Sequence, residues 1–112
     1  MARKGAPILA IGAALALAAC SPNHAPAPAI HTVVIDQLAF SPRATTANVG
    51  DVMVWVNKDI LRHSATDAGG AFDVDLPAGA TAKIVLEKAG SIKYACRYHP
   101  GMTGTISVAE KG

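Results

Sequence analysis

The chain is short and contains few cysteines and few charged residues. It has 112 residues and only two cysteines, Cys20 and Cys96, and charged residues make up 16% of the sequence. The ten basic and eight acidic residues form neither a basic patch nor an acidic tail, which excludes nucleic acid as an expected partner. The length allows one domain and leaves no room for a separate substrate domain.

A long hydrophobic run is also missing. The most apolar segment covers residues 8–19, whereas a helix needs about 20 apolar residues to cross the hydrocarbon core of a membrane. This segment follows Arg3 and Lys4 and contains no acidic residue, an order that is typical of a secretory signal peptide. We therefore expect residues 1–19 to be a signal peptide that is removed, leaving a formally neutral chain.

Residues 17–20, Leu-Ala-Ala-Cys, resemble a bacterial lipobox, in which the cysteine thiol receives a diacylglycerol before cleavage. The resemblance implies an exported protein that is anchored to a bacterial membrane through Cys20, on the periplasmic or extracytoplasmic side. An ordinary cleavage nearby is the alternative.

Residues 20–30 alternate Pro and Ala with nothing to bury, so we expect an extended tether.

The remainder, residues 31–112, is expected to form one all-β domain. No window keeps an apolar period of 3.6 residues, and Gly, Pro and Asp separate short strands at the spacing that is typical of a sandwich or barrel. Residues 52–57 are apolar on both faces, which predicts a central strand with Met53 and Trp55 in the core. Further strands are expected at residues 32–35, 43–49, 82–86, 91–95 and 103–108.

Cys96 has no predicted disulfide partner, and an unpaired thiol is unusual in an exported protein. It begins the sequence Cys96-Arg-Tyr-His99-Pro-Gly-Met102, directly after a predicted strand, and His63 stands 33 residues upstream, where another strand begins. Two imidazoles, a thiolate and a thioether are the donors of a blue-copper site, because soft sulfur suits Cu(I) and nitrogen suits Cu(II). Zinc also accepts Cys and His, but a structural zinc site favours more thiolates and does not recruit Met.

A family resemblance rests on residues 49–57 (VGDVMVWVN), 59–66 (DILRHSAT), 89–102 (AGSIKYACRYHPGM) and 104–108 (GTISV). These segments resemble a cupredoxin of the plastocyanin/amicyanin type. The two-residue gaps on either side of His99 are similar to the short ligand loop of amicyanin-like proteins. The resemblance implies a Greek-key β-sandwich with one type 1 copper, held by His63, Cys96 and His99 in the equatorial plane and by Met102 on the axis.

The same resemblance implies a carrier that shuttles one electron between redox proteins in the periplasm or at the membrane. The electron is expected to leave through a surface at His99 and Pro100. Many relatives follow the first ligand His with an Asn that ties the two ligand loops together, but this chain has Ser64 at that position. Ser64 is therefore expected to affect loop rigidity and redox potential, because hydrogen bonds around the ligands orient and tune the metal.

Two other functions are compatible with the sequence, one with copper and one without a metal. A copper scavenger or chaperone in the same compartment would bind the ion without passing electrons. An adhesion or scaffold module would keep the sandwich without a metal, and would stay colourless when Cu(II) is added. The sequence offers no nucleophile and base pair and no substrate pocket, so we expect neither enzyme activity nor a small-molecule substrate.

Overall fold

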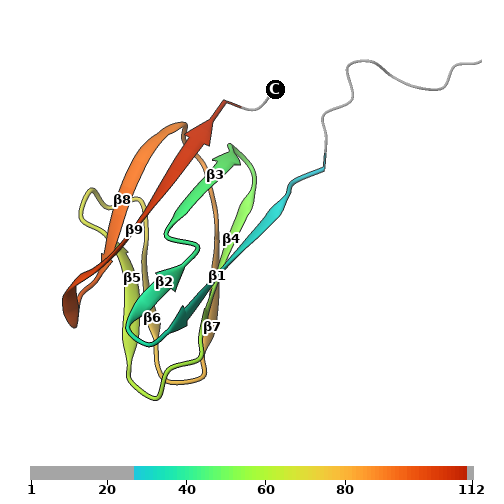
Figure 1. Ribbon diagram of the computed structural model, residues 1–112. Helices are drawn as coiled ribbons and strands as arrows, with labels where there is room; N and C mark the ends of the chain where they lie inside the picture. Colours follow the sequence, from blue (N-terminus) through green and yellow to red (C-terminus); the bar gives the residue numbers. More distant parts are fainter. Residues whose placement is uncertain (1–26, 111–112) are drawn as a thin grey trace, which may run out of the picture.

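The computed structural model describes residues 27–110, which form strands and turns (Figure 1). The signal peptide, Cys20 and most of the predicted tether lie outside these residues. Within residues 27–110, no helix is long and apolar enough to cross a membrane. The strands are β1 (Ile30–Asp36), β2 (Ala39–Ser41), β3 (Ala44–Asn48), β4 (Val52–Asn57), β5 (His63–Asp67), β6 (Asp73–Leu76), β7 (Thr81–Val85), β8 (Gly90–Cys96) and β9 (His99–Ala109).

Two sheets pack face to face (Figure 1). One has the strand order β2-β1-β4-β7, and the other has the order β3-β9-β8-β5-β6. β1 pairs with β4 and β3 pairs with β9 in parallel, and the other pairs are antiparallel. The predicted all-β Greek-key sandwich is confirmed.

β4 lies between β1 and β7, as its apolar pattern predicts. Successive side chains of a strand point to opposite faces, so burial alternates along β4 between fully and partly buried. Met53 and Trp55 point into the core and have no exposed surface. The prediction that both residues belong to the core is confirmed.

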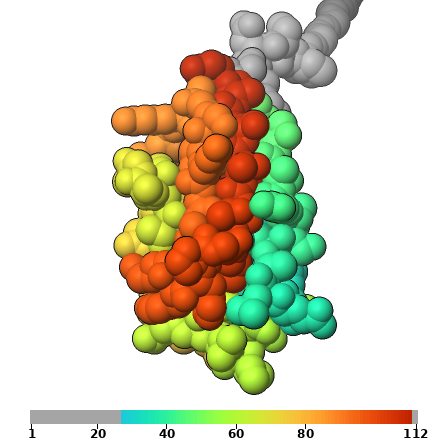
Figure 2. Space-filling model, turned by 60° about the vertical axis from the view of Figure 1, so that its left-hand side comes forward, coloured from blue at the N-terminus to red at the C-terminus, as the bar shows by residue number. Residues whose placement is uncertain are grey.

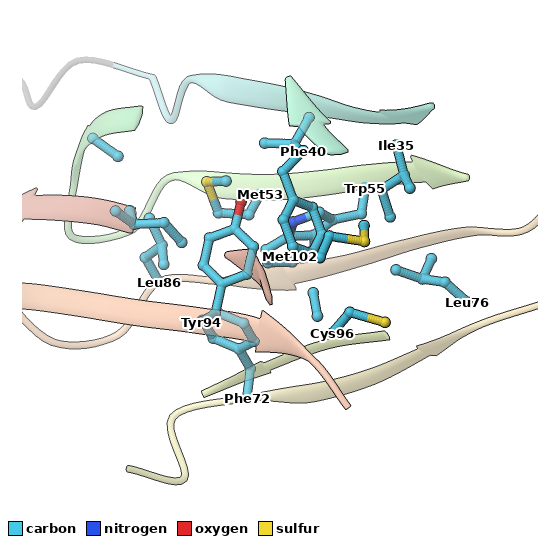
Figure 3. Close-up of a cluster of buried hydrophobic side chains, with 14 of the residues drawn as sticks. Ile35, Phe40, Met53, Trp55, Phe72, Leu76, Leu86, Tyr94, Cys96 and Met102 are labelled. Carbon is cyan, nitrogen blue, oxygen red and sulfur yellow. The ribbon is translucent and has the colours of Figure 1, made fainter. Parts of the chain in front are cut away.

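Four of the five aromatic side chains meet in the core next to this strand (Figure 3). The Tyr94 ring on β8 packs edge-on against Phe40 and Trp55, with ring centroids 4.8 and 5.5 Å apart. The Phe72 ring lies 5.1 Å from the Trp55 ring. Each such pair adds about 0.5–1.5 kcal/mol of stability beyond the burial of apolar area. The cluster therefore fixes the position of β8 in the sandwich. Cys96 is two residues further along the same strand.

The strands around the site differ from the sequence expectation in two places. β6 was not predicted, because its sequence Asp-Val-Asp-Leu contains as many acidic as apolar residues. It is an edge strand, and because side chains alternate along a strand, its two carboxylates face solvent while Leu76 is buried on the other face. β9 begins at His99 rather than at residue 103, so Arg97 and Tyr98 alone form the turn between β8 and β9.

The described chain enters the sandwich beside the turn between β3 and β4. β1 begins at Ile30, one residue before the predicted domain boundary, and Ile30 pairs with Val52. The buried Asp51 carboxylate accepts hydrogen bonds from the Ala29 N–H and from His31 Nε2–H, at 3.0 and 2.9 Å. β1 then runs along the sheet to Asp36, close to the end of the sandwich that carries the predicted site.

Candidate metal centre

Three of the predicted ligands lie at strand ends that the fold brings together. His63 is the first residue of β5, Cys96 is the last residue of β8, and His99 is the first residue of β9. The two-residue turn pairs Cys96 with His99 across the hairpin, and β5 is the other neighbour of β8. Ala95 pairs with Thr103 and Cys96 pairs with His99, so residues 100–102 of β9 have no partner on β8 and form a bulge in β9. Bulges bend a strand and re-aim its side chains, and this bulge contains Met102.

The donor atoms have the spacing of metal ligands. Cys96 Sγ lies 3.6 Å from Nδ1 of His63 and 3.6 Å from Nδ1 of His99. All three donor atoms lie within 4.8 Å of one another. Metal bonds of about 2.0–2.3 Å that meet at roughly 110–120° place nitrogen and sulfur about 3.6–3.8 Å apart. The two nitrogen–sulfur distances are therefore those expected of ligands to one ion.

Met102 supplies the fourth predicted donor. It is buried, with 5% of its surface exposed, and it belongs to the same cluster of buried side chains as Cys96 (Figure 3). His63 and Cys96 are also buried, whereas His99 is half-buried and reaches the surface. The sulfur donors and one imidazole are thus shielded from water, and one imidazole edge remains accessible.

Asp59 fixes the orientation of His63. Its carboxylate Oδ2 lies 2.8 Å from His63 Nε2 and also accepts the Leu38 N–H at 3.0 Å. These hydrogen bonds hold the pKa of Asp59 below its usual value, and the bond from Leu38 has the larger effect. An ionised carboxylate can only accept hydrogen bonds, so His63 carries its proton on Nε2. The lone pair of Nδ1 then points toward Cys96.

A model of the cupredoxin-like domain family matches residues 8–108. The chain belongs to this cupredoxin family. Two solved structures of amicyanin variants, one reduced and one oxidised, match with TM-scores of 0.64 and 0.63. Each is 21% identical in sequence and covers 70% of this chain and 80% of its own. A purple cupredoxin from Nitrosopumilus maritimus matches with a TM-score of 0.62 and 24% identity, over 70% of this chain and 99% of its own.

No curated protein matches the sequence. At these identities the solved structures establish the fold of this cupredoxin, and the side chains present decide what its site can hold. Two imidazoles, a buried thiol and a buried thioether are the donor set of a blue-copper centre. His63, Cys96, His99 and Met102 therefore fit one type 1 copper.

Ser64 links the two halves of the site. Its N–H donates to Cys96 Sγ at 3.4 Å, and its Oγ accepts the N–H of Arg97 at 2.8 Å. Ser64 and Cys96 are both fully buried, so these bonds are protected from competition by water. The residue after the first ligand therefore contacts the residue after the second, across 33 positions of the chain.

The end of this cupredoxin that carries the site also carries exposed apolar side chains. Ile60 is 90% exposed and Leu61 is 44% exposed, both in the loop between β4 and β5, and Leu38 is 48% exposed in the turn after β1. Pro100 is exposed next to His99. Figure 2 shows the yellow-green loop between β4 and β5 projecting at one end of the molecule, beside the orange-red hairpin of β8 and β9.

The sequence reasoning identified the donors but missed the side chains that hold them. Asp59 stood within a recognised segment, four residues before His63, and only that proximity hinted at its contact. Arg97, in the turn between β8 and β9, pairs with Asp73 at 2.8 Å, a contact that the sequence did not indicate. His31 lies at the other end of β1, away from the site, where it contacts Asp51.

Proposed function

We propose that this cupredoxin is a one-electron carrier between redox proteins, with one type 1 copper held by His63, Cys96, His99 and Met102. The observation that carries the proposal is the placement of two imidazole nitrogens at 3.6 Å from one buried thiol sulfur. Bound copper supplies the Cu(II)/Cu(I) couple. The chain supplies a mixed set of soft and nitrogen donors, which accommodates both oxidation states.

Rigidity supports electron transfer rather than a role in chemistry on a substrate. The donors lie at the ends of β5, β8 and β9, and the aromatic cluster in the core holds β8 in place. Hydrogen bonds from the Ser64 N–H to Cys96 and from His63 to Asp59 hold two of the donors in place. Donors that are already in place need little rearrangement when an electron arrives or leaves.

The half-buried His99 supports an exit route for the electron. Its imidazole contacts the buried donors on one side and reaches the surface on the other, next to the exposed Pro100. The apolar side chains of Ile60 and Leu61 lie at the same end of the molecule and offer a surface for a redox partner. With equal numbers of basic and acidic residues after position 19, we expect contact to depend more on apolar area than on charge.

We also propose that the protein is exported and anchored to a bacterial membrane through a lipid on Cys20. The described chain enters the sandwich at Ile30, and β1 extends about 20 Å from there toward the end that carries the site. An anchor joined to this end of β1 would leave His99 facing away from the membrane, toward soluble or membrane-bound partners.

The visible spectrum tests the copper site. The full chain, purified in detergent, is mixed with Cu(II), and we expect an intense band from charge transfer between the Cys96 thiolate and copper. Cys96→Ser should abolish the band, whereas the matched control Cys20→Ser should retain it. A colourless wild-type protein, or a band that depends on Cys20, contradicts the proposal.

A second measurement separates electron transfer from copper delivery. We expect reversible one-electron voltammetry and fast self-exchange between oxidised and reduced protein. Rapid transfer of copper to an apo-acceptor, together with slow self-exchange, would instead identify the protein as a copper-handling one.

A further inference from the structure

A closed ring of hydrogen bonds begins and ends on Arg97. Its backbone N–H donates to Ser64 Oγ at 2.8 Å, and Ser64 Oγ lies 2.8 Å from Thr66 Oγ1. Thr66 Oγ1 donates to Asp73 Oδ1 at 2.9 Å. The Arg97 guanidinium donates to the same carboxylate oxygen at 2.8 Å. The ring joins β5, β6 and the turn between β8 and β9.

The chemistry of the ring gives it a direction. A carboxylate only accepts hydrogen bonds, so the Thr66 hydroxyl points its proton at Asp73. The Ser64 hydroxyl then donates to Thr66 and presents a lone pair to the Arg97 N–H. Hydrogen bonds that run in one direction toward a charged acceptor strengthen one another. The exposed carboxylate thus determines how a fully buried hydroxyl is oriented.

We propose that Asp73 is a positioning residue of the copper site, acting through Thr66 and Ser64 on the peptide that follows Cys96. The inference rests on the proposed function, because it assigns the ring a role toward the copper that Cys96 would bind. The thiol sulfur and the ring share Ser64, whose N–H donates to Cys96 Sγ while its Oγ holds Arg97. Ser64 bonds the Arg97 N–H directly, and the ring adds a second connection to the same residue through Thr66 and Asp73.

The same strand offers a matched control. Asp75 lies two residues after Asp73 on β6, and its carboxylate is 3.6 Å from the Arg62 guanidinium. The Asp73 and Asp75 side chains are similarly exposed, at 54% and 50%. Asp75→Ala therefore removes the same charge and a similar ion pair without touching the ring. Thr66→Val interrupts the ring without changing any charge.

Amide hydrogen exchange in the copper-free full chain tests the ring itself. We expect the Arg97 N–H to exchange about three- to tenfold faster in Asp73→Ala and Thr66→Val than in wild type, because it loses an oriented acceptor. In Asp75→Ala its rate should stay at the wild-type value. An unchanged Arg97 rate in Asp73→Ala, or an equal increase in Asp75→Ala, overturns the inference.

Copper-loaded protein tests the role in positioning. We expect the thiolate band to shift or broaden in both Asp73→Ala and Thr66→Val and to keep its wild-type form in Asp75→Ala. Faster Arg97 exchange with an unaltered band would show a merely structural ring and would also overturn the inference. Absence of the band in wild type contradicts the proposed function instead, and the exchange rates of the copper-free chain still decide whether the ring exists.

Discussion

The carboxylate of Asp59 lies 2.8 Å from Nε2 of His63, while Nδ1 of the same imidazole faces the sulfur of Cys96. Asp59 is itself held in place, because it accepts the N–H groups of Gln37 and Leu38, both of which have a positive φ. A positive φ is uncommon outside glycine, so two such residues in succession mark a turn that its surroundings constrain. The turn after β1 thus determines where the first imidazole points.

Asp59→Asn should raise the reduction potential of the copper protein. The amide oxygen can still accept the His63 Nε2–H, so the orientation of the ring is kept while the negative charge is lost. A negative charge close to the site favours Cu(II), and its removal should raise the potential by an amount on the order of 50 mV, given that about 59 mV corresponds to a tenfold change in a one-electron equilibrium. Voltammetry measures the shift.

Asp36→Asn is the control for Asp59→Asn, since it removes a carboxylate at the end of β1 that makes no contact with His63. We expect a much smaller shift there. A potential that falls in Asp59→Asn, or equal shifts in the two variants, would contradict a specific role of the Asp59 carboxylate.

Met102→Leu should leave the fold and the thiolate band in place and raise the potential. Leucine has a similar volume, so the free energy of unfolding should fall by less than about 1.5 kcal/mol. The band would depend on Cys96, which is unchanged, whereas the thioether that would tune the potential of bound copper is lost. Loss of the band on this substitution would mean that Met102 holds the other ligands in place rather than acting as a weak donor to copper.

The sequence predicted the donors because three of them stand in one short motif directly after an apolar strand, and His63 lies upstream, after the apolar run of residues 52–57. β4 was equally clear, since its sequence is apolar on both faces, as expected of a strand with a neighbour on each side. Motifs and apolar patterns of this kind are local in the sequence. They indicate the donor residues and the strands that carry them, but not which other segments contact those strands.

The supporting contacts could not be predicted, because they join residues that are far apart in the chain. Asp59 meets Leu38 across 21 positions, and Arg97 meets Asp73 across 24. Each contact depends on which strands become neighbours, and β6, which carries Asp73, has a weak apolar pattern. Ser64 was singled out as a departure from relatives, but only the register of β5 and β8 shows what completes its role. Lipidation of Cys20 stays a prediction.

Gly104→Ala should destabilise the fold strongly. Gly104 lies opposite Tyr94 in the ladder between β8 and β9, and a Cβ at this position would lie 2.5 Å from the Tyr94 hydroxyl oxygen. The Tyr94 ring is held by Phe40, Trp55 and Phe72, so it has no room to move away. Overpacking of this kind costs about 1–3 kcal/mol, which urea unfolding measures.

Gly101→Ala is the matched control for Gly104→Ala, because it makes the same change in β9 where a Cβ meets no atom within 4 Å. Its free energy of unfolding should stay within about 0.5 kcal/mol of wild type. Equal losses in the two variants would show that β9 tolerates no alanine in general, rather than that Tyr94 blocks position 104.

Acid should weaken the fold through Asp51, at the opposite end from the site. The His31 Nε2–H, the Ala29 N–H and the Asn48 N–H bond its carboxylate, and they lower its pKa from 3.8 to about 2. Because the folded state holds the ionised form, the stability from Asp51 is fully present above pH 4 and is lost as the pH falls toward 2. We expect Asp51→Asn to have a lower urea midpoint than wild type at pH 6. The two midpoints should converge by pH 2, and a constant difference between pH 6 and pH 2 would contradict this origin of the acid sensitivity.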